Sequence, residues 1–287
     1  MDMANLLRIS MLLAFAFSAT QADAKWRWQI PENDEVMIEI NTERSELVTR
    51  NTLNPNEIDI FVWNMYKGDK PDWQRDYKNL TPNYDILILQ ELWLDHLMLQ
   101  TFYEDELFSY HMATSFIDRK RSETPTGVGT AAKVEPIRVF WQRSKYREPF
   151  IRTPKMVLYT EYALEGTDKT LLTGNIHAIN FVSSRKLRHQ LKNMSKVFAA
   201  HDGPAVMAGD FNTWSKKKMK YLHEFARESG MTEVKFDNGH ERMKTFGKYL
   251  DYIFVKGVEV YDSHVFGNSE GSDHKPMTVK ISVDTSK

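Results

Sequence analysis

Short apolar runs alternate with longer amphipathic segments along most of this chain. The runs at residues 58–63, 85–89, 171–176 and 205–208 have the length and continuity of buried β-strands. Weaker strand patterns occupy residues 109–116, 127–134, 136–142, 155–164, 249–255, 258–266 and 277–283. We expect the segments at 127–134, 136–142 and 155–164 to pair as successive antiparallel strands.

The amphipathic segments between these runs predict helices. They lie at residues 72–80, 94–107, 183–200 and 215–228. Ser183 and Ser184 are suited to cap the third helix, and Gly230 closes the last one. Helices interleaved with strands, some of them in antiparallel pairs, predict the α/β (α+β) class. Because no linker or shift of composition interrupts residues 25–287, we expect a single domain there.

The beginning of the chain does not follow this alternation. Residues 25–57 show only a candidate edge strand at 36–40. Residues 1–24 resemble an export signal, with Arg8 before an apolar run and small residues at Ala22 and Ala24 for cleavage. The run is too short to anchor the protein stably in a bilayer. We therefore expect a signal peptide at 1–24 and an exported protein, periplasmic or secreted.

The composition is that of an ordinary globular protein. Of 287 residues, 41% are hydrophobic and 27% charged, and the formal net charge is −1. No overall field therefore draws the chain to nucleic acid or to an anionic membrane, and any phosphate recognition must be local. Cysteine is absent, so an exported domain of this sequence relies on its core without disulfides.

Polar residues with catalytic side chains stand at the ends of the apolar runs. They are Asn64, Glu91, His177, Asp210, Asn212, Asp251, Asp273 and His274. The run at 205–208 is typical, because it leads into a carboxylate and a carboxamide two positions apart. In layered α/β proteins, side chains emerge from the core into a cleft at such strand ends. Together these residues supply carboxylates for a hard divalent cation and two imidazoles that move protons near neutral pH.

Each of these residues also has a simpler structural explanation. Residues 209–212 have the composition of a plain turn. Asn64 could satisfy backbone groups at a strand end, His177 could be a hydrogen-bonded core residue, and Asp251 could pair with Lys248. The occurrence of the whole set at the edges of separate strands favours one shared site.

The motifs carry a resemblance to a known family. They are Trp63-Asn64, Gln90-Glu91, Asn175-Ile176-His177, Gly209-Asp210-Phe211-Asn212, Leu250-Asp251-Tyr252 and Ser272-Asp273-His274. In this order they resemble the endonuclease/exonuclease/phosphatase superfamily, which includes deoxyribonuclease I, abasic-site endonucleases, bacterial sphingomyelinases and inositol-polyphosphate 5-phosphatases. The match spans residues 58–283. It implies a four-layer α/β/β/α sandwich of two similar halves, as in deoxyribonuclease I.

The resemblance implies catalytic roles for five residues. His274 looks like the general base for an attacking water, with Asp251 holding its ring in the right tautomer. Asp210 would orient that water or help to deprotonate it, and Asn212 would bind a non-bridging phosphate oxygen. His177 would contact phosphate or assist the leaving group. Abasic-site enzymes have tyrosine there, so His177 points to the deoxyribonuclease-like or sphingomyelinase-like branch.

The resemblance also implies a divalent cation. Glu91 would bind it, with Asn64 and Asp273 nearby. The expected ion is Mg²⁺ or Mn²⁺, and Ca²⁺ is an alternative. Zinc is disfavoured because cysteine is absent and none of the nine histidines forms a His-x-x-x-His pair.

Candidate substrate contacts follow two of the motifs. Arg185 opens a basic cluster after the His177 strand, and Lys216 opens another after Asn212, with Trp214 just before it. These clusters could grip a phosphate backbone or could be the solvated faces of helices. Trp214 could stack on a base or simply pack.

We therefore expect a metal-dependent phosphodiesterase that is a nucleic-acid endonuclease, monomeric and without a stable membrane anchor. The first alternative is a hydrolase of phospholipids or small phosphoesters. A lipid substrate ranks second because only 22 positions separate Asp251 from Asp273, which leaves little room for the aromatic hairpin that secreted sphingomyelinases insert into bilayers. A non-catalytic binding module on the same fold is the third hypothesis.

Overall fold

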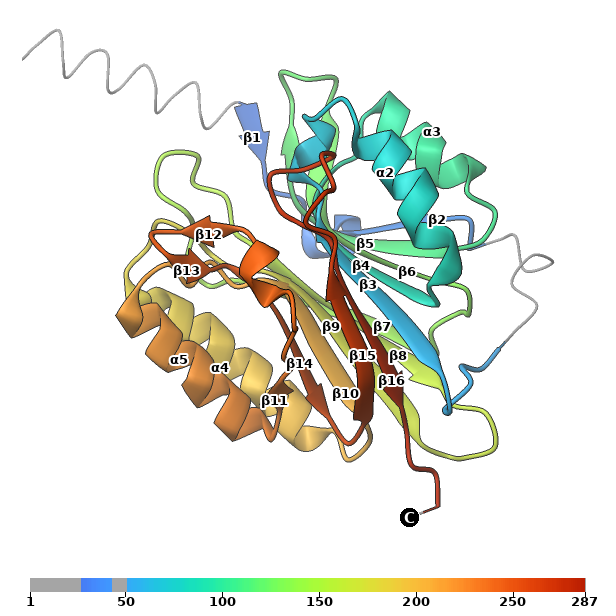
Figure 1. Cartoon of the computed structure of the whole chain (residues 1–287). Coiled ribbons are helices and arrows are strands. Elements are labelled where there is room, and N and C mark those ends of the chain that lie inside the picture. Colours follow the sequence, from blue (N-terminus) through green and yellow to red (C-terminus); the bar gives the residue numbers. More distant parts are fainter. Residues whose placement is uncertain (1–26, 43–50, 287) are drawn as a thin grey trace, which may run out of the picture.

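The computed structural model describes residues 27–42 and 51–286. Within these residues two β-sheets pack face to face and helices cover both outer faces, so the fold is the four-layer α/β/β/α sandwich (Figure 1). The signal peptide expected at residues 1–24 lies outside the described part. None of the described helices is long and apolar enough to cross a membrane.

The first sheet has the strand order β1-β5-β6-β4-β3-β16-β15, and β2 also pairs with β5. Its strands are β1 (Trp28–Gln29), β2 (Met37–Ile40), β3 (Ile58–Asn64), β4 (Ile86–Trp93), β5 (Ser109–Asp118), β6 (Thr124–Ala132), β15 (Glu259–Val265) and β16 (Met277–Ser282). β3 and β4 are parallel, and the other pairs are antiparallel. The helices α2 (Trp73–Leu80) and α3 (His96–Glu104) cover its outer face.

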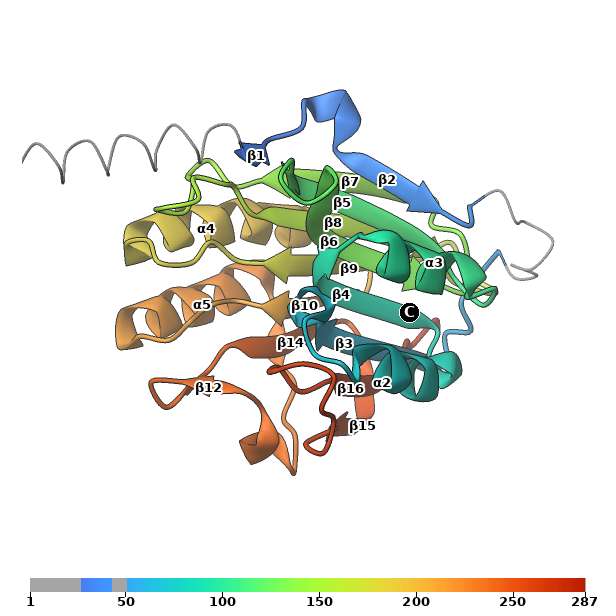
Figure 2. The ribbon, with the colours of Figure 1, turned by 90° about the horizontal axis from the view of Figure 1, so that it is seen from above.

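The second sheet has the order β11-β14-β10-β9-β8-β7. Its strands are β7 (Arg138–Arg143), β8 (Met156–Ala163), β9 (Thr170–His177), β10 (Ala205–Asp210), β11 (Thr232–Glu233) and β14 (Asp251–Lys256). β9 and β10 are parallel. The helices α4 (Ser184–Ala200) and α5 (Lys216–Ser229) cover this sheet, and Figure 2 shows them across both sheets from α2 and α3.

Short elements complete the described chain. β12 (Lys244–Thr245) and β13 (Lys248–Tyr249) form a small hairpin, and the short 3₁₀ helices are η1 (Asn33–Glu35), η2 (Tyr66–Gly68), η3 (Thr81–Asn83) and η4 (Gly239–Glu241). These elements were not predicted, because each is too short to carry a hydrophobic period.

The central strands are buried on both faces, which explains their continuous apolar sequence. Along β3, Ile58, Ile60 and Val62 point between the sheets, whereas Phe61 and Trp63 point toward α2 and α3. This alternation follows from the two-residue period of a strand. A strand covered by a sheet on one side and helices on the other needs apolar residues at every position.

One predicted strand pairing is wrong. We expected residues 127–134 and 136–142 to pair with each other, but β6 belongs to the first sheet and β7 to the second, where β7 pairs with β8. The chain crosses between the sheets around Pro136, which has no N–H for a ladder hydrogen bond. The strands expected at 109–116 and 127–134 are also extended toward each other, because β5 runs to Asp118 and β6 begins at Thr124.

Candidate active site

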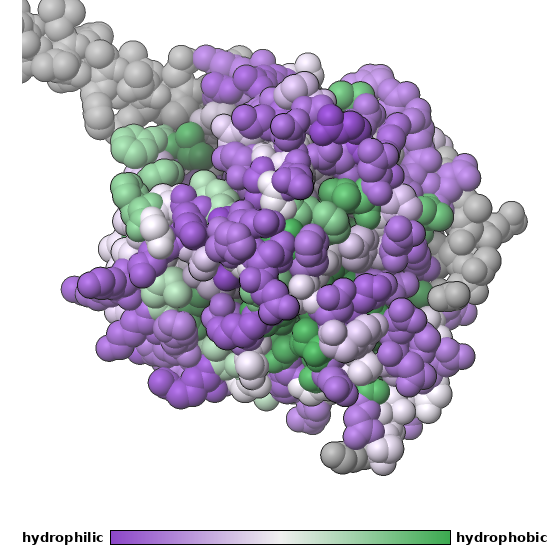
Figure 3. Space-filling model, viewed as in Figure 1, coloured by the Kyte–Doolittle hydropathy of each residue, from purple (hydrophilic) through white to green (hydrophobic). Residues whose placement is uncertain are grey.

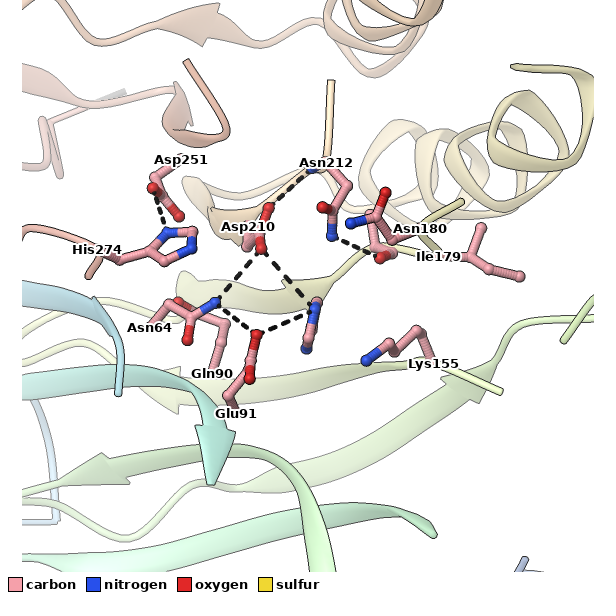
Figure 4. Close-up of polar contacts among 12 residues, drawn as sticks. Asn64, Gln90, Glu91, Lys155, Ile179, Asn180, Asp210, Asn212, Asp251 and His274 are labelled. Carbon is pink, nitrogen blue, oxygen red and sulfur yellow. Dashed lines mark hydrogen bonds and ion pairs between the residues drawn. The ribbon is translucent and has the colours of Figure 1, made fainter. Parts of the chain in front are cut away.

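The carboxyl ends of the two parallel strand pairs meet between the sheets. Asn64 ends β3, Glu91 lies near the end of β4, His177 ends β9 and Asp210 ends β10. Because the sheets face each other, these side chains come to one place (Figure 4). His177 Nε2 lies 3.7 Å from Glu91 Oε1 and 3.8 Å from Asp210 Oδ2. The sequence prediction that these residues share one site is supported by this geometry.

Asn64 joins the two carboxylates. Its Nδ2 donates to Glu91 Oε1 and to Asp210 Oδ2, both at 3.3 Å. Its Oδ1 accepts a hydrogen bond from the backbone N–H of Tyr66 at 3.1 Å. The amide oxygen is therefore occupied by the backbone, and the amide nitrogen holds the two acids facing each other.

His274 and Asp251 form a buried pair beside Asp210. Asp251 opens β14 and lies opposite Asp210 in the register of β10 and β14. His274 precedes β16, and its Nδ1 lies 2.7 Å from Asp251 Oδ2, which fixes the ring through an Nδ1–H donor. The His274 Nε2 is thus left for another partner on the side of the cleft.

The loop that carries His274 is tied to the first half of the molecule. Asp76 of α2 accepts hydrogen bonds from Ser269 Oγ at 2.7 Å, Glu270 N at 2.9 Å and Gly271 N at 2.8 Å. Burial alone would raise the pKa of Asp76, but these hydrogen bonds and one from Arg75 outweigh burial and lower the pKa below its ordinary value. Asp76 is therefore an ionised anchor for this loop.

Two residues of the site have left-handed backbone conformations. Glu91 has φ 52° and Asn212 has φ 51°. The Asn212 N–H donates to Asp210 Oδ1 at 2.8 Å, and its side-chain Nδ2 donates to the Ala178 carbonyl at 3.0 Å. Asparagine tolerates this region through such local hydrogen bonds, but for glutamate it costs about 1 kcal/mol. The strained turn at Glu91 aims its carboxylate at His177.

Beneath the site, buried amides connect the two sheets. Gln90 Nε2 donates to Asn175 Oδ1 at 2.8 Å, and Asn175 Nδ2 donates to the carbonyls of Leu89 and Gly129 at 2.9 and 2.8 Å. Both side chains are completely buried. These two motif residues therefore hold the strand ends in register rather than face the cleft, a task that the motifs alone did not reveal.

Glu91 and His177 differ in charge at neutral pH. Burial alone would raise the pKa of Glu91, but the positive charge of protonated His177, followed by those of Lys155 and Lys67, lowers it to about 2. Burial, together with the charge of Lys155, lowers the pKa of His177 to about 3. Glu91 is thus an anion, and His177 is a neutral imidazole that can accept or donate a hydrogen bond.

The pKa values of Asp210 and His274 are both raised, which favours the protonated form of each. Burial and the negative charge of Asp251 raise the pKa of Asp210. Burial alone would lower the pKa of His274, but the charge and the hydrogen bond of Asp251 raise it. This corner of the site therefore favours holding protons, as an acid–base group must.

The described residues include two groups of side chains that could hold a metal ion. One is Glu91, His177 and Asp210, and the other is Asp210, Asp251 and His274, with the ligand atoms of each group within 4.8 Å of one another. The first group fits a hard divalent cation better. In the second group Asp251 is already paired with His274 at 2.7 Å, whereas in the first group Lys67 lies 3.5 Å from Glu91.

Four of the predicted site residues lie apart from this centre. Asp273 is exposed and belongs to neither group of candidate ligands. Arg185 and Lys216 are exposed at the starts of α4 and α5, and neither lines the cleft beside Glu91. Trp214 Nε1 donates to Asn180 Oδ1 at 2.8 Å, and its ring packs 4.1 Å from Lys218 Nζ. Trp214 therefore packs behind the cleft.

The cleft contains cationic residues that the sequence did not single out. Lys67 Nζ lies 3.5 Å from Glu91 Oε2. Lys155 Nζ lies 3.6 Å from Glu148 Oε2, and its head points toward the catalytic groups (Figure 4). Lys155 is a single lysine before β8 with no motif around it, so nothing in the local sequence could have identified it.

Comparisons with known proteins agree with this geometry. A model of the endonuclease/exonuclease/phosphatase family matches residues 61–274. A UPF0294 protein of Klebsiella pneumoniae is 35% identical over 230 residues, which cover 79% of this chain and 82% of that protein. A UPF0294 protein of Vibrio campbellii is 29% identical over 286 residues, covering 96% and 98%.

Solved structures share the fold at low sequence identity. A family member from Beutenbergia cavernae has a TM-score of 0.61 at 14% identity, covering 79% of this chain and 72% of that one. The human Nocturnin catalytic domain has a TM-score of 0.58 at 15% identity, covering 80% and 96%. A mannosyl-6-phosphatase of Bacteroides thetaiotaomicron has a TM-score of 0.57 at 14% identity, covering 78% and 99%.

Proposed function

This chain belongs to the endonuclease/exonuclease/phosphatase family, whose members are generally hydrolases of phosphoester bonds, and we propose that it is a metal-dependent phosphodiesterase that cleaves nucleic acid. One observation carries the proposal. Glu91, His177 and Asp210 meet the His274–Asp251 pair at one end of the space between the sheets. An anionic metal ligand, a neutral imidazole and an acid–base pair are then within reach of one phosphorus centre.

His274 would be the proton acceptor of this mechanism in its neutral form, which is favoured when a bound cation offsets the negative charges that raise its pKa. Its Nδ1–H is held by Asp251 at 2.7 Å, so Nε2 can take a proton from an attacking water while Asp251 stabilises the imidazolium that forms. Asp210 lies beside this pair and would orient the same water. The second amide hydrogen of Asn212 would donate to a non-bridging phosphate oxygen, because the first is used on Ala178.

The metal would bind at Glu91. A bound Mg²⁺ or Mn²⁺ would neutralise charge on the phosphoryl oxygens. The hydrogen bonds of Asn64 keep Glu91 facing Asp210, so the water that Asp210 would orient lies beside the cation site. His177, which is neutral at pH 7, would contact the phosphate or donate to the leaving oxygen.

Charge in the cleft supports nucleic acid as the substrate. Lys67, Arg121 and Lys155 line it together with Glu91 and His177. Such cations attract the phosphates of a nucleic-acid backbone, and they repel a choline headgroup. With the signal peptide expected at residues 1–24, the enzyme would act on nucleic acid outside the cytoplasm.

The proposal is tested by hydrolysis of bis-p-nitrophenyl phosphate and nicking of supercoiled plasmid, with Mg²⁺, Mn²⁺ or Ca²⁺ and with EDTA as the control. We expect activity that requires metal and falls at least about 100-fold in His274→Ala and in Asp210→Ala. His223→Ala is the matched control, because His223 is an exposed histidine on α5. A folded protein that hydrolyses neither substrate with any metal would refute the proposal. Release of phosphocholine or inorganic phosphate, without nicking, would favour the lipid or small-phosphoester alternative.

A further inference from the structure

A pocket of about 350 Å³ extends from the catalytic residues to the edge of the first sheet. Glu91 and His177 form its inner end. Its far wall comes from Trp28 of β1, and its mouth includes Phe181, which follows β9. Further apolar lining comes from Trp93, Phe116, Val128, Ile151 and Met156. The pocket thus combines aromatic and apolar side chains with charged ones such as Arg121 and Lys155, and Glu91 and His177 of the candidate active site lie at one end of it.

Trp28 is held in the wall by a partly buried ion pair of its neighbour Arg27. Arg27 donates to the fully buried Asp118 with Nε–Oδ1 at 3.0 Å and Nη2–Oδ2 at 2.7 Å. Trp28 pairs with Asp118 in the β1–β5 register, and its ring meets the edge of Phe116 at 5.0 Å. Because β1 has only two residues, this anchoring contributes few backbone hydrogen bonds to the sheet. Its main effect is to fix one indole beside the cleft.

Phe181 is exposed at the mouth of the same pocket. Its side chain is 69% exposed, and its backbone has φ 51°. The turn is held by Asn180, whose N–H donates to the buried Glu148 and whose Oδ1 accepts from the Phe181 N–H, both at 2.8 Å. A bulky residue in a left-handed conformation costs about 1 kcal/mol, and an exposed ring recovers none of it by packing. The ring of Phe181 is therefore an unpacked aromatic surface at the mouth of the pocket.

Figure 3 shows hydrophobic positions gathered at the upper left of a mainly hydrophilic face. In Figure 1 this region holds the loops at the open end of the second sheet. Flat apolar rings next to cations are the surfaces on which unpaired bases stack, and each stacked base contributes about 1–3 kcal/mol. A base inside a duplex must first be unstacked and unpaired, at a cost of a few kcal/mol, before it can enter a pocket with walls on several sides.

We propose that this pocket binds one unpaired nucleobase adjacent to the scissile phosphate, with Trp28 and Phe181 as its stacking surfaces, so that the enzyme prefers single-stranded nucleic acid. This inference rests on the phosphodiesterase proposed above. Lys67 and Lys155 bind the phosphate at the catalytic end, and the aromatic end binds the base. The volume is in the range of small-ligand pockets, about 300–1,000 Å³, which suits one nucleotide rather than a strand segment.

The test compares kcat/KM for a single-stranded oligonucleotide, the same sequence as a duplex, and a strand of the same length made of abasic residues. We expect the single strand to be preferred over both by about 10-fold or more. Trp28→Ala and Phe181→Ala should each lower kcat/KM for the single strand about 5- to 150-fold and remove the preference, whereas Trp28→Phe should keep most of it. Phe246→Ala is the matched control, because Phe246 is also exposed with positive φ but does not line the pocket.

A binding measurement separates this inference from the catalytic proposal. Fluorescence anisotropy of the labelled single strand with His274→Ala protein in EDTA should show binding that weakens in the double variant with Trp28→Ala. Plasmid nicking with equal rates on single strand, duplex and abasic strand would overturn the base pocket and keep the phosphodiesterase. Trp28-dependent binding without hydrolysis of any substrate would keep the base pocket and overturn the phosphodiesterase. Trp28-dependent binding of phosphatidylcholine/phosphatidylglycerol vesicles, with no oligonucleotide binding, would overturn the base pocket.

Discussion

The two halves of the molecule use the same backbone arrangement to present different chemistry. In each half a pair of parallel strands ends at the site, with Asn64 and Glu91 in the first and His177 and Asp210 in the second. Glu91 and Asn212, one in each half, both have positive φ. Glu91 lies inside β4, where the pairing with β6 shifts register between Leu89 and Leu92, and Asn212 follows β10. In both halves an irregular backbone near a strand end thus places a polar side chain at the site.

The halves differ in how they treat charge. Glu91 has Lys67 and Lys155 nearby, and its pKa is lowered to about 2. Asp210 faces Asp251 and is buried, and its pKa is raised. The first half thus provides a permanent anion for a cation, and the second half provides groups that exchange protons. This difference suggests that the first half holds the metal and the second half activates water.

The largest effect on activity is expected when the carboxylate of Asp210 or of Glu91 is replaced by the uncharged amide of the same shape. Asp210→Asn should lower kcat about 10²–10⁴-fold at every metal concentration, because a proton-transfer group is lost. Glu91→Gln should instead raise the concentration of Mg²⁺ needed for half-maximal activity, and excess metal should restore part of the rate. Steady-state rates of bis-p-nitrophenyl phosphate hydrolysis across a Mg²⁺ titration measure both. If the two variants had the same metal dependence, the proposed division between the halves would be wrong.

A smaller effect is expected at the connection between the halves. Asp76 of α2 accepts three hydrogen bonds from residues 269–271, just before His274. Asp76→Ala would leave the partly buried N–H of Glu270 and the buried N–H of Gly271 without this partner, so the free energy of unfolding should fall by about 2–3 kcal/mol. Urea denaturation at pH 7 measures this loss. Asp72→Asn is the control, because Asp72 pairs with Arg75 at the surface of the same helix.

The contribution of Asp76 should depend on pH. Its folded pKa is lower than its unfolded pKa of about 3.9. The stabilisation is therefore complete above the unfolded value and is lost as pH falls through the folded value. The difference in unfolding free energy between the wild type and Asp76→Ala should shrink below about pH 4. A difference that stays constant down to pH 2 would mean that Asp76 stabilises the loop by packing alone.

The sequence predicted the strand ends well because each buried strand is a continuous apolar run that stops at a polar residue. It could not predict connections between distant segments. Asp76 and Gly271 lie 195 positions apart, and neither has a local pattern that indicates the other. Trp28 lies in a two-residue strand, which is too short for any period. The basic cluster after His177 was ambiguous, and the structure shows its Arg188 paired with Glu224 between α4 and α5.

The smallest predicted effect is on the pH dependence of stability, and it is tested with one lysine from each half. Lys218 is 1% exposed, and its Nζ donates to the Asn212 carbonyl at 3.1 Å, whereas the Lys67 side chain is 39% exposed. Burial lowers the pKa of Lys218 to about 8, so the folded protein loses this proton before the unfolded chain, whose lysine titrates near 10.4. The unfolded state then binds more protons between these values, and the free energy of unfolding should rise with pH there.

Lys218→Met should remove that rise, and the difference from the wild type should amount to the order of 1 kcal/mol between pH 8 and pH 10. Other groups that titrate in this range are common to both proteins and cancel in the difference. Lys67→Met serves as the comparison from the first half, because the Lys67 side chain is 39% exposed. Urea denaturation at several pH values measures all three proteins. A flat difference for Lys218→Met would show that the ammonium under Asn212 is as well solvated as one at the surface, and that the second half does not bury its cation.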